Sequence, residues 1–416
     1  MTGDTGSAPI TIVNNAVNGL GLGHVTRLIA INRWIRRIAM ESGRRVQICF
    51  LTSSEAAQVL HQERFVSLKI ADTKVAAAGG LDAPFYFRFA RRWLRHGLDL
   101  LKPDLMIVDT FPGGAFDEFP DALQACQRTA FIYRPVKAFR AAHSRYQRAL
   151  LAYDAILVPE IERRVTVAVP ARARNRLQYL GPVIVRERSE VLPRAVARER
   201  LAIHGERLAI YISMGGGGDS TVDAVLRPVA AALAALRDVH LVVGAGPLYR
   251  GDPLGGPNLT WVTQSGVCEL MNGFDLAVSA AGYNSFVELM HFGVPTVFVP
   301  QRRDADDQHL RAQWAVEAGA AVCADPADLG GIVVAVERWR DAGRRRVASD
   351  AARSVVPVNY ARDFAASLLG LVGRPRRRSG AGVLKVASLT ATLRATIPRP
   401  VATTVRTVRS RLRRPS

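Results

Sequence analysis

The chain has 416 residues, of which 49% are hydrophobic and 22% are charged, and its formal net charge is +20. This length suits two domains or one large one, and the composition excludes wholesale disorder, a collagen-like chain and a coiled coil. Twelve basic residues and no acidic ones fall in residues 373–416, so the rest of the chain carries only +8.

In the first half of the chain, short apolar segments rich in β-branched residues alternate with segments of helical period. This alternation predicts βα units that build a parallel sheet buried on both faces. We expect strands at Ile10–Ala16, Val46–Thr52, Val66–Ile70, Leu105–Asp109, Thr129–Tyr133 and Ala155–Val158.

The second half repeats the pattern after a helix expected at residues 193–204. Its strands are expected at Leu208–Met214, His240–Gly244, Leu259–Val262, Leu276–Ser279, Thr296–Val299 and Ala321–Ala324. The predicted fold class is therefore α/β, with two Rossmann-like domains at residues 1–185 and 186–372 and a basic tail at 373–416. The carboxyl ends of the two parallel sheets should face each other across a cleft, where small ligands normally bind.

A glycine-rich turn, NGLGLGHVTR, follows the first strand and opens a helix. Gly21 lies three residues before His24, and Gly23 directly precedes it. Glycines let backbone N–H groups and the positive helix end approach an anionic or oxygen-rich ligand. The spacing fits neither the dinucleotide fingerprint nor the Walker pattern. The alternative is a tight strand-to-helix turn capped by the histidine.

The first strand of the second half ends in four glycines, Gly215, Gly216, Gly217 and Gly218. A turn needs only one or two, and each further glycine costs chain entropy. The run therefore predicts a ligand that lies against bare backbone, such as a diphosphate. The alternative is a loose loop capped by Asp219.

Residues 275–322 read as strand, turn, helix, strand, acidic loop and helix. Carboxylate and amide side chains gather where the helices of this stretch begin. Such groups can bind vicinal diols like those of ribose and hexoses, so we expect hydroxyl recognition here. These residues are Asn284, Ser285, Glu288, Asp306, Asp307 and Gln308. The alternatives are helix capping for Asn284, Ser285 and the two aspartates, and complementation of the helix dipole for Glu288.

This stretch resembles the C-terminal half of family 28 glycosyltransferases and is more distantly similar to UDP-glucuronosyl and macrolide glycosyltransferases. The resemblance covers both domains and implies the GT-B arrangement of two Rossmann-like halves. It implies that His24 is the catalytic histidine and that Gly21 and Gly23 belong to an acceptor-side loop. The donor-binding residues that we predict are Gly215, Gly216, Gly217, Ala281, Gly282, Asn284, Ser285, Glu288, Asp307 and Gln308. Among them, the resemblance assigns the glycines of 215–217 to the diphosphate, Glu288 to ribose, and Asp307 with Gln308 to the sugar.

Two departures from the family pattern limit the resemblance. Arg311 stands where the family commonly has Asn, and the first loop reads G-L-G-L-G-H instead of G-G-T-G-G-H. These differences argue against the N-acetylglucosaminyltransferase of peptidoglycan synthesis itself, and they leave the donor sugar open.

Transfer from a UDP-sugar requires a base for the acceptor hydroxyl and neutralisation of the leaving diphosphate. His24 is the candidate base. Asp109, at the end of a strand in IVDTFPGG, reaches the same rim of the sheet and could orient the imidazole; its alternative role is to cap the turn before Pro112. We expect no cofactor and no metal site, with helix-terminal N–H groups taking the metal's role.

The predicted function is a hexosyltransferase that moves a sugar from UDP to an acceptor hydroxyl on a lipid-linked or small molecule. A nucleotide-sugar 2-epimerase and a non-catalytic UDP-sugar-binding protein are the alternatives. The segment FYFRFARRWLR could clamp an acceptor or form a cationic amphipathic helix. Nucleic acid is not an expected partner, because the basic tail contains no aromatic residue on which bases could stack. The last aromatic residue of the chain is Phe364.

The tail predicts contact with an anionic membrane surface. Val386, Leu389, Leu393 and Ile397 form one helical stripe, and arginines flank it. The alternative is a disordered, solubilising tail. No signal peptide or long apolar run is evident, and the four cysteines are far apart in the sequence. We therefore expect a cytoplasmic protein, peripheral at the inner face of the membrane.

Overall fold

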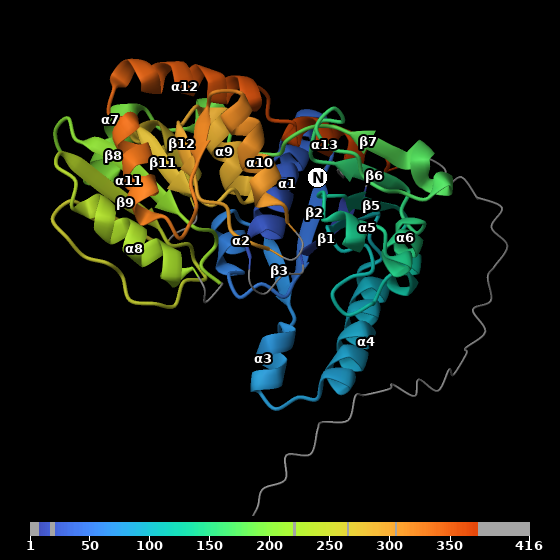
Figure 1. Ribbon diagram of the computed structural model, residues 1–416. Coiled ribbons are helices and arrows are strands. Elements are labelled where there is room, and N and C mark those ends of the chain that lie inside the picture. Colours follow the sequence, from blue (N-terminus) through green and yellow to red (C-terminus); the bar gives the residue numbers. More distant parts are fainter. Residues whose placement is uncertain (1–7, 17–20, 219–221, 264–265, 304–305, 373–416) are drawn as a thin grey trace, which may run out of the picture. The chain divides into compact units, whose positions relative to one another are not determined.

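The computed structural model describes residues 8–16, 21–218, 222–263, 266–303 and 306–372 (Figure 1). These residues belong to one compact unit. The predicted basic tail and Asp219 lie outside the described residues.

The first part of the described chain contains a seven-stranded parallel sheet with the order β3-β2-β1-β4-β5-β6-β7. Its strands are β1 (Ile10–Ala16), β2 (Val46–Thr52), β3 (Val66–Lys69), β4 (Leu105–Asp109), β5 (Thr129–Ile132), β6 (Ala155–Val158) and β7 (Leu177–Tyr179). The order reverses between β1 and β4. In a doubly wound sheet, ligands bind outside the carboxyl ends of the strands at this point.

A six-stranded parallel sheet with the order β10-β9-β8-β11-β12-β13 occupies the second part of the described chain. Its strands are β8 (Leu208–Ser213), β9 (Val239–Gly244), β10 (Leu259–Val262), β11 (Leu276–Ser279), β12 (Thr296–Phe298) and β13 (Ala321–Cys323). Its order reverses between β8 and β11. The prediction of two doubly wound parallel sheets is confirmed.

Helices connect the strands and cover the two sheets (Figure 1). The α-helices are α1 (Gly23–Glu41), α2 (Gln58–Gln62), α3 (Thr73–Ala78), α4 (Ala83–Leu101), α5 (Ala138–Ala141), α6 (Ser144–Leu150), α7 (Arg194–Arg200), α8 (Asp223–Ala234), α9 (Tyr283–Phe292), α10 (Gln308–Glu317), α11 (Leu329–Arg338), α12 (Ala342–Val355) and α13 (Ala361–Leu369). The 3₁₀ helices are η1 (Asp121–Ala125), η2 (Ala171–Arg176), η3 (Arg188–Glu190) and η4 (Val267–Gly273). No helix in the described ranges combines the length and apolarity needed to span a bilayer.

Helix α1 packs on the first sheet through an apolar stripe. Leu28, Ile31 and Ile35 recur at helical spacing, and each is fully buried in the core that α1 shares with β1 and β2. This packing fixes the first turn of α1 at the carboxyl end of β1. The histidine of the glycine-rich turn is therefore held by a long, buried helix rather than by a free loop.

Helix α13 packs against α1, although more than 300 residues separate them in the sequence (Figure 1). Phe364 and Leu368 are buried in the core of the first sheet. The Tyr360 N–H donates to the Pro182 carbonyl at 2.9 Å. At this point the chain returns to the first sheet beside the segment that leads from the first sheet to the second. The last described helix thus completes the core of the first sheet.

The segment FYFRFARRWLR lies in α4. This helix is amphipathic, in agreement with the prediction of a cationic amphipathic helix. Tyr86, Ala90 and Leu94 are buried, whereas Phe85 and Phe89 are exposed. Asp82 caps the helix by accepting from the Phe85 N–H at 3.1 Å. Among the described residues, none of α4 lines the cavity described below.

Candidate active site

A cavity of about 960 Å³ lies where the carboxyl ends of β1 and β4 in the first sheet approach those of β8 and β11 in the second. Its lining comes from both halves of the chain, including the start of α1, the 215–218 loop and the start of α9. Both strand-order reversals therefore open onto one site, as the sequence predicts.

His24 lies in the first turn of α1 and lines this cavity. Its Nδ1 is 3.2 Å from Oδ1 of Asp109, the last residue of β4. The imidazole also stacks on Phe111, with ring centroids 5.4 Å apart. The structure therefore brings together the two residues predicted to be catalytic, and it leaves Nε2 as the ring nitrogen available to a ligand.

Arg27, which the sequence analysis did not select, completes this cluster. Its Nε donates to Asp109 Oδ2 at 2.8 Å and its Nη2 donates to Oδ1 at 2.9 Å. Arg27 and Asp109 are almost entirely excluded from solvent, and the Thr110 hydroxyl also contacts the carboxylate. Arg27 follows His24 by three residues, so both lie on one face of the helix. This spacing is the feature of the sequence that could have indicated Arg27.

The charges of the cluster determine its protonation. Burial alone would raise the pKa of Asp109, but Arg27 and His24 hold it well below its usual range. Burial lowers the pKa of His24, while Asp109 opposes this change and Arg27 and Arg134 add to it. The cluster therefore holds an ionised carboxylate, a charged guanidinium and a neutral imidazole near pH 7.

The tetraglycine loop lines the cavity beside the start of α1. Gly217 has φ of +82°, and a Cβ on it would lie 2.5 Å from the Ala245 carbonyl oxygen. Packing and backbone conformation therefore require glycine at this position. A Cβ on Gly216 would lie 3.5 Å from the Leu22 nitrogen, in ordinary contact. A Cβ on Gly215 would meet no atom within 4 Å, although its φ of +119° favours glycine. The bare backbone at 215 and 216 therefore faces the open site.

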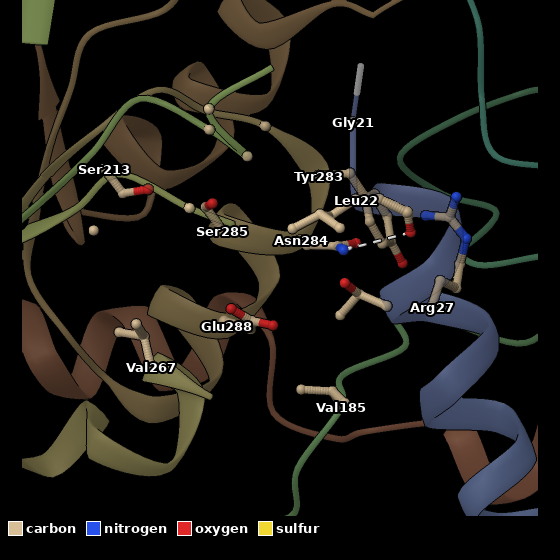
Figure 2. Close-up of a pocket in the computed structure, with 18 of the residues that line it drawn as sticks. Gly21, Leu22, Arg27, Val185, Ser213, Val267, Tyr283, Asn284, Ser285 and Glu288 are labelled. Carbon is tan, nitrogen blue, oxygen red and sulfur yellow. Dashed lines mark hydrogen bonds between the residues drawn. The ribbon is translucent and has the colours of Figure 1, made fainter. Parts of the chain in front are cut away.

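Helix α9 begins at the carboxyl end of β11 and turns its first residues toward the cavity (Figure 2). Gly282, Asn284 and Ser285 line it, whereas Ala281 is buried and accepts from Arg311 Nη1 at 2.6 Å through its carbonyl. The Asn284 amide donates to the Gly23 carbonyl at 3.4 Å, a contact that joins the starts of α9 and α1. The geometry shows no side-chain cap from Asn284 or Ser285 on α9.

Glu288 lies in the second turn of α9, half-buried, and lines the cavity. Burial raises the pKa of its carboxyl to about 7, although Arg186 favours the ionised form. Because the residue lies beyond the first turn, complementation of the helix dipole is a weak explanation for it. A half-buried carboxyl that faces the cavity, with no ion pair among the described residues, is instead suited to accept hydrogen bonds from a ligand.

The structure separates the residues of the acidic loop. Asp307 is exposed, is absent from the cavity lining and caps α10 by accepting from the Leu310 N–H at 3.1 Å. Gln308 is buried, lines the cavity and accepts from the Gln301 N–H at 2.9 Å. Asp306 also lines the cavity. The capping alternative therefore describes Asp307, and Asp306 is the carboxylate of this loop that reaches the site.

Asp306 is shared by two arginines from different halves of the chain. Arg134, which follows β5, donates to its Oδ1 at 2.8 Å, and Arg311 donates to Oδ1 at 2.8 Å and to Oδ2 at 3.3 Å. Burial opposes ionisation of Asp306, but these arginines lower its pKa to about 2. Arg311, at the position where the family pattern has Asn, thus joins the acidic loop to the Ala281 turn.

Comparisons with known proteins agree with this geometry. Residues 260–354 match the glycosyltransferase family 28 C-terminal domain. The solved structure of the spinosyn forosaminyltransferase SpnP aligns with 88% of this chain and 100% of its own, with a TM-score of 0.62 and 14% identity. The chain therefore has the GT-B fold of these glycosyltransferases, and residues 260–354 resemble the C-terminal domain of family 28.

Two further matches concern proteins whose names include a nucleotide or a nucleotide sugar. The UDP-N-acetylglucosamine–N-acetylmuramyl-(pentapeptide) pyrophosphoryl-undecaprenol N-acetylglucosamine transferase of Mycobacterium sp. (strain JLS) is 28% identical over 50% of this chain and 62% of its own length. The spinosyn rhamnosyltransferase SpnG, solved in complex with thymidine diphosphate, aligns with 86% of this chain and 100% of its own at 15% identity, with a TM-score of 0.57. The chain spans about half to three-fifths of the length of the curated relatives it matches.

Proposed function

We propose that the protein is a glycosyltransferase that moves a hexose-type sugar from a UDP-sugar to an acceptor hydroxyl, with His24 as the general base. The acceptor is a lipid-linked or a small hydroxyl compound, two classes that appear in the names of similar proteins. The observation that carries the proposal is a single cavity with a buried His24–Asp109 pair on one side and the 215–218 loop with the start of α9 on the other.

The start of α9 suits the leaving diphosphate. The first N–H groups of a helix have no partner within it, and they carry a partial positive charge that stabilises an anion. Gly282 and Ser285 place this end of α9 at the cavity. The proposal needs no cofactor and no metal, so activity should survive treatment of the protein with EDTA.

A panel of nucleotide sugars tests the proposal on purified protein. UDP-glucose, UDP-N-acetylglucosamine and UDP-galactose are incubated with and without candidate acceptors, and dTDP-sugars are included because SpnG was solved with thymidine diphosphate. Release of free nucleoside diphosphate that depends on an acceptor supports transfer. Interconversion of the donor sugar without net UDP release would favour the 2-epimerase, and UDP-sugar binding without turnover would favour a non-catalytic binding protein.

Replacing Glu288 by alanine should weaken UDP binding by about 1 to 3 kcal/mol, the cost of leaving ribose hydroxyls unpaired in a buried site. Because burial raises the pKa of this carboxyl to about 7, the wild-type affinity should also rise between about pH 6 and pH 8, as the better acceptor, the ionised form, becomes populated. Isothermal titration calorimetry measures both effects.

Two variants serve as controls for Glu288. Glu288→Gln removes the titrating group, so its UDP affinity should follow only the ionisation of the UDP phosphate. Glu317→Ala removes an exposed carboxylate on α10 that accepts from the Gln313 amide, and it should bind UDP normally. Equal affinity of wild type and Glu288→Ala for UDP would remove the ribose assignment.

We further propose that residues 373–416 hold the protein on an anionic membrane face, which would suit a lipid-linked acceptor. Each basic residue near such a surface contributes about 1 kcal/mol and is screened by salt. Full-length protein should therefore sediment with anionic but not neutral vesicles and dissociate at high salt, and a truncation after Val372 should stay in the supernatant.

The exposed face of α4 offers the matched control. Phe85→Asp with Phe89→Asp changes two exposed aromatic residues of that helix and keeps the tail intact. The double variant should sediment like the wild type. If the truncated protein sediments as well as the full chain while the double variant does not, the attachment belongs to α4 and the tail proposal is wrong.

A further inference from the structure

The contact between Arg27 and Asp109 is the most fully buried ion pair of the candidate site. The guanidinium uses two nitrogens, Nε and Nη2, at 2.8 and 2.9 Å from the two carboxylate oxygens. Arg27 is 1% exposed and Asp109 is 0% exposed. A side-on pair of this kind fixes both the position and the plane of the carboxylate, because the planar fork matches its two oxygens.

The same carboxylate contacts His24, so Arg27 acts on the imidazole through Asp109. A carboxylate whose sole partner is a histidine favours the imidazolium and raises the histidine pKa. Here Asp109 already has a full positive partner, which removes most of that attraction. Its Oδ1 still accepts from Nδ1–H at 3.2 Å, so the proton belongs on Nδ1 and the lone pair on Nε2.

We propose that Arg27 is a positioning residue that keeps His24 as the neutral Nδ1–H tautomer, with the Nε2 lone pair ready to accept a proton in the cavity. This inference rests on the proposed function, in which His24 is the base. In that reaction Nε2 takes the proton of the acceptor hydroxyl, the acceptor oxygen bonds to the anomeric carbon, and the bond from that carbon to the diphosphate oxygen breaks with its electrons on the leaving nucleotide.

The surroundings of His24 support this assignment. Three charged groups face it: Asp109 from β4, Arg27 from its own helix and Arg134 from the segment after β5. Arg134 is bound to Asp306, which also pairs with Arg311, whereas Arg27 lies in direct contact with the carboxylate that holds the imidazole. The histidine pKa is lowered by burial, and both arginines lower it further while Asp109 raises it.

Arg27 is itself held from the second half of the chain. Its guanidinium lies over the ring of Tyr283, 4.9 Å from the centroid. The Tyr283 hydroxyl donates to the Pro159 carbonyl at 2.6 Å and accepts from the Val183 N–H at 3.2 Å, which fixes the ring. Figure 2 shows Arg27 and Tyr283 side by side where α1 meets α9. The first residue of α9 thus buttresses the arginine that positions the base.

The test measures His24 directly by ¹⁵N NMR of protein labelled at its eight histidines, with His24→Gln used to assign the signal. In the wild type, His24 should remain neutral at pH 7 with the proton on Nδ1. In Arg27→Met its pKa should rise by about 1 to 3 pH units, because a neighbouring positive charge has been removed. In Asp109→Asn its pKa should fall and the tautomer preference should be lost.

Arg37→Met is the matched control, since Arg37 lies on the same helix about 15 Å away and pairs with Glu190. It should leave the titration of His24 unchanged. Arg27→Lys retains the charge without the fork, so it should keep the pKa near the wild-type value while lowering kcat by about tenfold or more, with KM nearly constant.

Each outcome decides the proposal. An unchanged His24 pKa in folded Arg27→Met would overturn it. If Arg27→Met does not fold, a wild-type His24 that is charged at pH 7 or carries its proton on Nε2 would do the same. The NMR readout requires no substrate, so it remains decisive if transferase activity is not found. A shifted pKa with unchanged kcat would uphold the positioning role and reject His24 as the base.

Discussion

Replacing His24 by alanine is expected to lower the turnover number of the proposed transferase by about 100-fold or more, because general-base assistance contributes about 10²- to 10⁴-fold. UDP affinity should change little, since the residues predicted to contact the nucleotide belong to the second half of the chain. Steady-state kinetics with the best donor and acceptor, together with calorimetry for UDP, separates chemistry from binding.

His96→Ala is the control for this experiment, because His96 is exposed on α4 and outside the cavity. It should have wild-type kinetics. If His24→Ala loses UDP binding and turnover together, the histidine has a structural role. Asp109 is a poor substitute base in that case, since Arg27 binds both of its oxygens and the pKa of the carboxyl lies well below its usual range.

Replacing Asp109 by alanine should destabilise the protein by about 3 to 5 kcal/mol, because the Arg27 charge is then left buried without a partner. Chemical denaturation measures this loss. Since the folded-state pKa of Asp109 is depressed, its contribution is present above the unfolded pKa of about 3.9 and is lost as the pH falls. The difference between wild type and variant should therefore shrink below about pH 4.

A double variant distinguishes a buried ion pair from a packing defect. Arg27→Met with Asp109→Leu replaces both charges by apolar side chains, and it should be more stable than Asp109→Ala alone. If the double variant is destabilised by the sum of the single losses, the two residues act independently and the ion-pair argument is wrong.

The fold was largely predictable because parallel strands have a strong local signature. Buried apolar runs predict β1, β2, β4 and β6 with the bounds that the structure has. The packing of α13 was not predictable in this way, because helical period indicates that a helix forms and which face is apolar, but not which distant surface it covers.

The candidate site shows the same division. His24 and Asp109 could be placed together because the carboxyl ends of neighbouring parallel strands share one edge. Arg27 and Arg134 were missed, since their partners are remote in sequence and arginine alone is not diagnostic. In the acidic loop, three adjacent polar residues offer several registers, and only the backbone geometry reveals that Asp306 enters the cavity while Asp307 caps α10.

The return of the chain to its first sheet has a consequence for protein synthesis. Phe364 and Leu368 fill the core beneath α1, yet a ribosome makes them only after every strand of the second sheet. A nascent chain that ends near Pro182 would lack these side chains, so the part of the first core that α13 covers would be exposed to chaperones and proteases. We therefore expect the core of the first half to be completed only after α13 has left the exit tunnel, and a truncated product that lacks this helix to be cleared rather than to accumulate.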